Sequence, residues 1–261
     1  MSDLIRASEN ETEQKEKRRD YDVNDERWFS KDAVVLLQRA QEEIVWLLDR
    51  NYKISTIIEL VGGHYQLSAR QRIALQRACC TSKQNECRRQ KLQSLQAAKK
   101  NILYIDGFNL IITLEVALSN SILIMGSDGC IRDIAGLRGT YRLIDKTQGA
   151  LELIGRALNE LEIPYCKFYL DSPVSNSGRL KSAILEHAEN WGMEIEVELV
   201  QNPDNILFNL DHVVTSDSVI LDNCISWVNL SGKIIEEYVQ DVRIIDLRSK
   251  HSGNELPHEI T

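Results

Sequence analysis

The sequence predicts an α/β fold: a mostly parallel β-sheet with helices on both faces, preceded by a small N-terminal α-helical domain. From Asn101 onward, short apolar runs suited to buried strands alternate with helical stretches of about 10–15 residues, which is typical of parallel sheets. Residues 27–100 carry helical periodicity instead. The 261 residues are 43% hydrophobic and 27% charged, so the composition is that of an ordinary globular protein.

Composition divides the chain into four predicted parts. The first residues are polar and rich in Glu and Lys, which predicts disorder because they cannot bury enough apolar surface. A change from helical periodicity to alternating strands and helices sets the main boundary. The parts are a disordered N-terminal tail (1–26), a helical domain with a basic helix (27–100), an α/β domain (101–249) and a flexible C-terminal tail (250–261).

The helical domain begins with a capped amphipathic helix. Ser30 is suited to cap a helix that runs to about Asn51, with apolar residues spaced along one face. Gly62-Gly63 is expected to break the chain. Ser68 is then expected to cap a second helix, which carries part of a strongly basic stretch.

The α/β domain opens with an apolar run that is too short for a helix and suits a buried strand. A Gly/Asp turn at 126–129 lies between two short extended runs, which predicts a β-hairpin or an irregular insertion. The predicted strands are Ile102–Ile105, Ser121–Met125, Cys130–Asp133, Tyr165–Leu170, Glu194–Val200, His212–Val214 and Arg243–Ile245. The predicted helices are Leu110–Leu118, Thr147–Leu161, Arg179–Asn190, Pro203–Leu210 and Ser218–Trp227.

Aspartates lie at predicted strand ends or in the first turn of a helix: Asp106, Asp171, Asp204 and Asp217. The carboxyl ends of parallel strands meet at one edge of a sheet, so we expect these side chains to converge. Acids this close repel one another and are stable together around a cation. Oxygen ligands without His or Cys select Mg²⁺ or Mn²⁺, which suit hydrolysis of a phosphodiester. Taken singly, each aspartate is also typical of a helix cap or turn.

Two segments carry a resemblance to a known family. Tyr104-Ile-Asp-Gly-Phe-Asn109 resembles the opening strand of PIN-like nucleases, especially their NYN branch. Asn202-Pro-Asp204 followed by His212-Val-Val-Thr-Ser-Asp217 resembles the later part of the same pattern. The whole chain is also similar to an uncharacterised family of domain-of-unknown-function (434-type) proteins, which have a helical front and a PIN-like rear.

The resemblance to PIN-like nucleases implies a PIN-like (Rossmannoid) fold and a Mg²⁺- or Mn²⁺-dependent ribonuclease. Carried over by position, it implies that Asp106, Asp204 and Asp217 bind the metal. It also implies that Asn109 orients Asp106, and Asp171 is expected to assist catalysis. NYN enzymes commonly have a second acid two residues after the strand-end aspartate, where this chain has Val219.

Two other functions stay open at this point. Because Val219 replaces an acid, the chain is also compatible with a catalytically inactive PIN-like module that binds RNA or a protein partner. A phosphatase or phosphotransferase acting on a small substrate at the same acidic site is a third alternative.

Several polar residues near the predicted strand ends are candidates for holding a substrate. Arginines in a Gly-containing loop after the hairpin suit phosphate contacts, because a guanidinium matches phosphate oxygens; surface salt bridges are the alternative. A polar loop entering the helix at Arg179 offers free backbone N–H groups to a phosphate, or is a plain capping turn. The expected substrate-binding residues are Arg132, Arg138, Arg142, Asn176, Ser177, Arg179, Thr215 and Ser216.

Charge is distributed unevenly. The chain carries a net charge of −8, yet residues 66–100 hold nine basic residues against the single acid Glu86. This basic segment predicts an RNA-facing arm beside an acidic body, or else a solvated helix face. No apolar run is long enough for a membrane helix and no secretory signal is visible, so we expect a cytoplasmic protein without a membrane partner. A homodimer is left open.

The six cysteines follow no disulfide framework and are interpreted as reduced thiols. Cys79, Cys80 and Cys87 lie downstream of His64, but their spacing matches no zinc pattern, so packing between helices is the favoured role.

Overall fold

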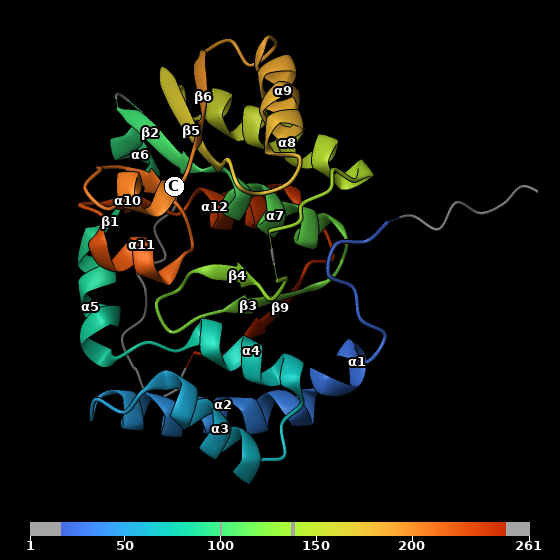
Figure 1. Ribbon diagram of the computed structural model, residues 1–261, viewed down its shortest axis with the longest axis vertical. Helices are drawn as coiled ribbons and strands as arrows, with labels where there is room; N and C mark the ends of the chain where they lie inside the picture. Colours follow the sequence, from blue (N-terminus) through green and yellow to red (C-terminus); the bar gives the residue numbers. More distant parts are fainter. Residues whose placement is uncertain (1–16, 100, 137–138, 249–261) are drawn as a thin grey trace, which may run out of the picture.

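The computed structural model describes residues 17–99, 101–136 and 139–248 (Figure 1). Within them, six strands form an all-parallel sheet in the order β1-β8-β7-β2-β5-β6. Its strands are β1 (Leu92–Gln93), β2 (Ile102–Asp106), β5 (Tyr165–Asp171), β6 (Glu194–Val200), β7 (Val213–Val214) and β8 (Trp227–Val228). The predicted α/β class with a parallel sheet is confirmed. The predicted C-terminal tail (250–261) and Arg138 lie outside the described residues.

Helices cover both faces of this large sheet, as alternate residues of β5 demonstrate. Phe168 packs in a core cluster with residues of the helices that follow β2 and β5. Its neighbour Tyr169 packs in another cluster, with Leu207 and Ile220 on the opposite face. Because successive strand residues point to opposite sides, one strand buries side chains in both layers.

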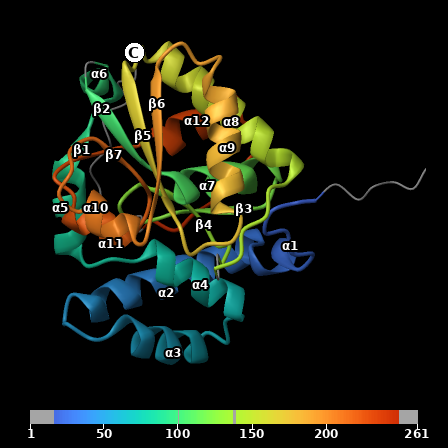
Figure 2. The same ribbon diagram turned by 45° about the horizontal axis from the view of Figure 1, so that its top comes forward.

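A second sheet lies apart from the first. Among the described residues it contains three strands in the order β4-β3-β9. Strand β3 (Ile122–Met125) pairs antiparallel with β4 (Ile131–Asp133), so the predicted hairpin is confirmed, and parallel with β9 (Arg243–Asp246). Helix α7 (Gly107–Leu118) contacts strands of both sheets and is buried along most of its length. Most of its residues are apolar and buried because it lies between two sheets, as Figure 2 shows.

Helices α1 to α4 form a layer beneath the small sheet, whereas α5 lies beside α11 (Ser218–Asn223) and α6 lies near β2 (Figures 1 and 2). Ile122 and Ile124 of β3 share a core cluster with Leu37 and Leu75 from this layer. The helices are α1 (Asp25–Trp28), α2 (Lys31–Leu48), α3 (Ile54–His64), α4 (Ala69–Ala78), α5 (Ser82–Lys91) and α6 (Leu95–Ala98). The helical region therefore shares a core with strands from later in the chain.

The predicted caps of α2 and α4 are confirmed, and the predicted break is wrong. The hydroxyls of Ser30 and Ser68 accept hydrogen bonds from backbone N–H groups in the first turns of these helices. Gly62 lies inside α3 instead of ending it. A Cβ at Gly62 would lie 2.6 Å from the guanidinium of Arg72, which donates to the carbonyls of Ile58 and Leu67. The glycine makes room for this side chain.

The remaining helices follow the predicted pattern until the last third of the chain. They are α8 (Asp145–Glu160), α9 (Ser177–Ala188), α10 (Pro203–Leu207), α11 (Ser218–Asn223) and α12 (Leu230–Tyr238). A single helix through Trp227 was expected, but α11 ends at Asn223 and Trp227 begins strand β8. Trp227 is fully buried and its indole N–H donates to the Arg88 carbonyl at 2.7 Å, a tertiary contact that local periodicity does not reveal. No helix in the described ranges is long and apolar enough to span a bilayer.

Two glycines of α8 provide a matched stability test. A Cβ at Gly155 would overlap the indole ring of Trp191, whereas a Cβ at Gly149 would make ordinary contact with Leu118 at 3.4 Å. We expect Gly155→Ala to lower the free energy of unfolding by about 1–3 kcal/mol through overpacking. Gly149→Ala should raise it by up to about 1 kcal/mol through helix propensity. Urea unfolding measures both, and equal effects would contradict the packing of Trp191 on α8.

Candidate active site

Asp106 lies at the centre of the candidate site. It is the last residue of β2, its side chain caps α7, and only 8% of the residue is exposed. The hydroxyl of Thr215 donates to its Oδ2 at 2.9 Å, and the backbone N–H of Asn109 donates to its Oδ1 at 3.4 Å. Burial raises the pKa of Asp106 from its ordinary value of 3.8 to about 7, and the charges of Asp217 and Asp204 act in the same direction.

The turn after β7 is tied to α7 by the side chain of Asn109. Its Oδ1 accepts hydrogen bonds from the Ser216 backbone N–H at 2.8 Å and from the Ser216 hydroxyl at 3.1 Å. Thr215 and Ser216 are both buried. Thr215 and Ser216 therefore hold the acids in place. Asn109 supports Asp106 in two ways: its backbone N–H donates to the carboxylate, and its side chain fixes the turn that carries Thr215.

The other predicted acids surround the same point. Asp217 caps α11, and its Oδ1 accepts hydrogen bonds from the N–H groups of Val219 and Ile220. Asp204 lies in the first turn of α10, after the cap Asn202. Burial and the charge of Asp217 raise the pKa of Asp204. The structure therefore brings Asp217 and Asp204 to the edge where β2 ends.

Asp171 joins this group from the end of β5. Burial raises the pKa of Asp171, and the charge of Asp204 raises it further. The four aspartates, called here the rim acids, are thus linked by charge: Asp204 acts on Asp171, Asp217 acts on Asp204, and both Asp204 and Asp217 act on Asp106. Carboxylates brought this close resist ionisation unless a cation balances them.

The oxygen atoms of the rim acids are suitable ligands for a metal ion, but the spacing of these side chains does not form a ready-made site. Among the described residues, no group of three or more His, Cys, Asp or Glu side chains is spaced to hold a metal ion, and this includes Cys79, Cys80 and Cys87. A closed cage of three carboxylates is therefore not formed. Mg²⁺ takes oxygen ligands, keeps several waters, and is commonly held by one or two carboxylates together with substrate phosphates. Asp106 and Asp217 are the pair best suited to that mode, because Asp217 is the strongest charged influence on Asp106 among the rim acids.

The arginines that were predicted to bind substrate differ in exposure. Arg132 was expected to contact substrate, but it lies in β4, is 4% exposed, and pairs with Asp128 at 2.6 Å. It cannot face a substrate, because its guanidinium is engaged by Asp128 and by the Ser216 carbonyl in the turn after β7. Arg142 and Arg179 are exposed. Asn176 donates to the Tyr141 carbonyl at 2.6 Å, which holds the segment of Arg142 beside the start of α9. Ser177 is buried, and its hydroxyl contacts the Ser172 carbonyl.

Tyr141 and Glu115 belong to a buried cluster away from the rim acids. Tyr141 is fully buried, and its hydroxyl donates to Glu115 at 2.7 Å. Glu115 also pairs with Arg19 at 2.7 Å and accepts a hydrogen bond from Thr147. Burial raises the pKa of Glu115 although these partners oppose the shift. The cluster fixes the N-terminal segment to α7.

Much of the basic segment (residues 66–100) is engaged inside the protein. Arg70 pairs with Asp20 and Asp25, and Arg77 pairs with Asp133. Further contacts are made by Arg72 to backbone carbonyls, Arg88 to Asp128 and Asp222, Lys91 to the carbonyls at the end of α11, and Lys99 to Glu162. Lys83 and Arg89 are exposed. The segment fastens the helical layer to the rest of the chain more than it offers charge to a partner.

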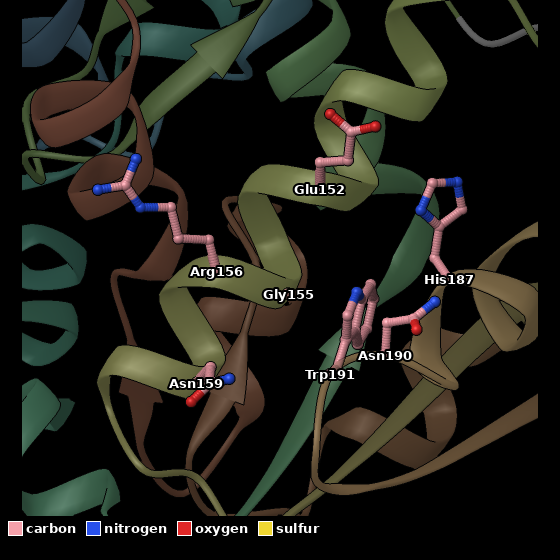
Figure 3. Close-up of a pocket in the computed structure, with 7 residues that line it drawn as sticks. All are labelled: Glu152, Gly155, Arg156, Asn159, His187, Asn190 and Trp191. Atoms are coloured by element: carbon pink, nitrogen blue, oxygen red, sulfur yellow. The ribbon is translucent and has the colours of Figure 1, made fainter.

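Two surface depressions lie elsewhere. A depression of about 380 Å³ is lined by α8 residues such as Glu152 and Arg156, by His187 in the last turn of α9, and by Asn190 and Trp191 after it, as Figure 3 shows. A neighbouring one of about 260 Å³ is lined by Pro164 and Met193, which precede β5 and β6. Both are therefore at the amino ends of the strands, opposite the rim acids, and contain none of them.

Comparison with known proteins now places the chain in a family. Residues 95–233 match the family model described as "Domain of unknown function (DUF5616)". The match covers more than half of the 261 residues. The chain belongs to this DUF5616 family. Residues 36–91 match "Protein of unknown function (DUF434)", so the expected kinship with an uncharacterised 434-type family is confirmed.

The chain also resembles a curated protein over most of its length. The uncharacterized protein MJ0935 of Methanocaldococcus jannaschii is 33% identical over 202 residues, which cover 77% of this chain and 97% of the relative. No solved structure matches the chain. All four rim acids lie within the DUF5616 region, whereas α5, with its basic residues, lies within the DUF434 region.

The environment of Asp106 predicts how stability depends on pH in the absence of divalent metal. A carboxyl whose pKa is higher in the folded state stabilises the fold below its unfolded pKa, and this contribution is lost as the pH rises through the folded value. Wild-type stability should therefore fall relative to Asp106→Asn between pH 4 and pH 7, by at most about 1.4 kcal/mol per pH unit. Urea unfolding at several pH values tests this. Asp32→Asn, at an exposed carboxylate of α2, is the control, and curves for Asp106→Asn that stay parallel to wild type would contradict the prediction.

Proposed function

We propose that this chain is a Mg²⁺- or Mn²⁺-dependent phosphodiesterase, most simply a ribonuclease of PIN-like, NYN type. What supports the proposal is the convergence of the four rim acids around buried Asp106 at the carboxyl edge of a parallel sheet. Open α/β sheets bind their ligands at this edge. The same acids are those that the resemblance to PIN-like nucleases assigns to the metal.

Each residue has a physical task in this proposal. Asp106 and Asp217 would hold the ion, with Asp204 and Asp171 adding negative charge beside them. When bound, the ion lowers the pKa of a coordinated water and polarises a phosphoryl oxygen. Thr215 and Asn109 keep the Asp106 carboxylate and the turn before Asp217 in place through their hydrogen bonds. Because the pKa of Asp106 is about 7, its ionised form is favoured above neutral pH or by a bound cation.

Exposed arginines beside the rim supply the charge that a phosphate chain requires. Arg179 lies in the first turn of α9, soon after Asp171 ends β5. Arg142 is held near it, since Asn176 and Ser175 both contact Tyr141. A guanidinium binds phosphate oxygens through a planar fork of donors, so both residues suit the backbone of RNA.

Replacement of Asp106 tests catalysis directly. Asp106→Asn should reduce Mn²⁺- or Mg²⁺-dependent cleavage of a fluorescent single-stranded RNA by at least about 100-fold, because one charged ligand of the ion is lost. Asp32→Asn serves as the matched control, and EDTA should abolish the wild-type activity. A folded wild-type protein that leaves single-stranded and structured RNA uncut with either metal would refute the proposed enzyme.

The two exposed arginines should affect substrate binding more than turnover. Arg142→Gln and Arg179→Gln are each expected to raise KM about 3- to 10-fold with little change in kcat, because uniform phosphate binding is lost. Arg156→Gln is the control, since Arg156 is an exposed arginine at the opposite end of the strands. Steady-state cleavage at several RNA concentrations distinguishes these effects. An equal response of all three variants would mean a general charge effect.

A non-catalytic RNA-binding module is the second candidate. Val219 is 53% exposed beside Asp217, at the position where NYN enzymes commonly have another acid. Such a module would bind RNA with a steep salt dependence. It would show no thermal shift with Mn²⁺ and no cleavage.

A further inference from the structure

The turn that carries Asp217 is held from behind by two buried arginines. Arg132 of β4 donates from Nε to the Ser216 carbonyl at 2.7 Å, on one side of Asp217. Arg88 of α5 donates from Nη2 to the Ser218 carbonyl at 3.2 Å, on the other side. The two guanidinium groups thus bracket the backbone of this rim acid.

A single carboxylate joins the two arginines. Asp128, in the turn of the β3–β4 hairpin, accepts two hydrogen bonds from Arg132, at 2.7 and 2.6 Å, and one from Arg88 at 2.7 Å. Although burial opposes ionisation, Arg132 and Arg88 lower the pKa of Asp128 to about 2. All three residues are less than 7% exposed. The network is therefore charged at neutral pH and buried out of reach of a substrate.

Both the side chain and the backbone of Arg88 are held by hydrogen bonds. Its Nε donates to Asp222 of α11 at 2.7 Å, and Gln84 donates to the other oxygen of the same carboxylate. Its own carbonyl accepts the indole N–H of Trp227 from β8. Because α5 belongs to the DUF434 region, a residue from that region reaches the turn that holds a rim acid of the DUF5616 region.

We propose that Arg132 and Arg88 are positioning residues that set the orientation of Asp217 through the carbonyls of Ser216 and Ser218. This inference rests on the proposed function, because it assigns Asp217 a role in metal binding. It also gives the helical region a task at the site: Arg88 completes the support of the turn. A planar guanidinium donates in several fixed directions at once, which a lysine ammonium on a flexible stem does not reproduce.

Charge-preserving variants test the proposal in the full chain. Arg132→Lys and Arg88→Lys keep the positive charge next to Asp128 but lose the bracketing hydrogen bonds. Normalised to the folded fraction, kcat for RNA cleavage with Mn²⁺ should fall about 10- to 100-fold, with KM changed less than about 2-fold. In parallel, amide exchange of Val219 and Ile220, whose N–H groups donate to Asp217, should become about 10-fold faster.

Arg77→Lys is the matched control. Arg77 also reaches from the helical region to the hairpin, where it donates to the carbonyls of Asp133 and Ala135, yet it does not touch the Asp217 turn. It should leave kcat and the exchange of Val219 and Ile220 unchanged. If the lysine variants do not fold, Asp222→Asn provides the same comparison, because it removes one partly exposed partner of Arg88 and leaves the Arg132–Asp128 pair intact.

The outcomes separate the two proposals. Unchanged kcat and exchange in both lysine variants would overturn the positioning role, as would a rise in KM alone, which indicates direct substrate contact. If wild type cleaves no RNA, the proposed function fails. The exchange of Val219 and Ile220 then still decides whether the arginines hold the turn.

Discussion

The parallel pairing of β2 with both β5 and β7 is the constraint on which the rest of the site depends. It brings the end of β2, the end of β5 and the turn after β7 to the same edge of one sheet. Asp106, Asp171 and Asp217 meet there although they are remote in sequence. An antiparallel partner would have sent one of them to the opposite edge. The cost of this arrangement is the burial of carboxylates close to one another: burial, and to a smaller extent the charges of neighbouring aspartates, raise the pKa values of Asp106, Asp171 and Asp204.

Arginines do most of their work inside the molecule. Arg70 fastens the segment of Asp20 and Asp25 to α4, and Arg77, Arg88 and Arg132 fasten the helical layer and the hairpin to each other and to the rim. Removal of one partner from such a buried pair leaves an uncompensated charge, which is strongly destabilising. The basic segment therefore acts as an internal connector, and the outward positive charge beside the rim acids comes from Arg142 and Arg179 instead.

Local signals in the sequence were sufficient for much of the fold. Strand β6 runs over the predicted residues Glu194–Val200, because alternation of charged and apolar side chains is a property of the strand itself. Ser30 and Ser68 cap helices for an equally local reason. Strand β8 and helix α12 escaped prediction, since Trp227 is drawn into the sheet by burial and by the distant carbonyl of Arg88. The convergence of the rim acids could be predicted only because the sequence pattern also predicted that the strands run parallel.

The chain's own order of residues settled which acids end strands and which hydroxyls begin helices, because these depend on near neighbours along the backbone. It could not settle which arginine would face solvent. Arg132 and Arg142 look alike in sequence, yet one is buried against Asp128 and the other is exposed. Ion pairs join residues that are far apart in the sequence, such as Arg88 and Asp222, which are 134 positions apart. The tertiary fold alone therefore decided which arginines support the site and which remain exposed to a ligand.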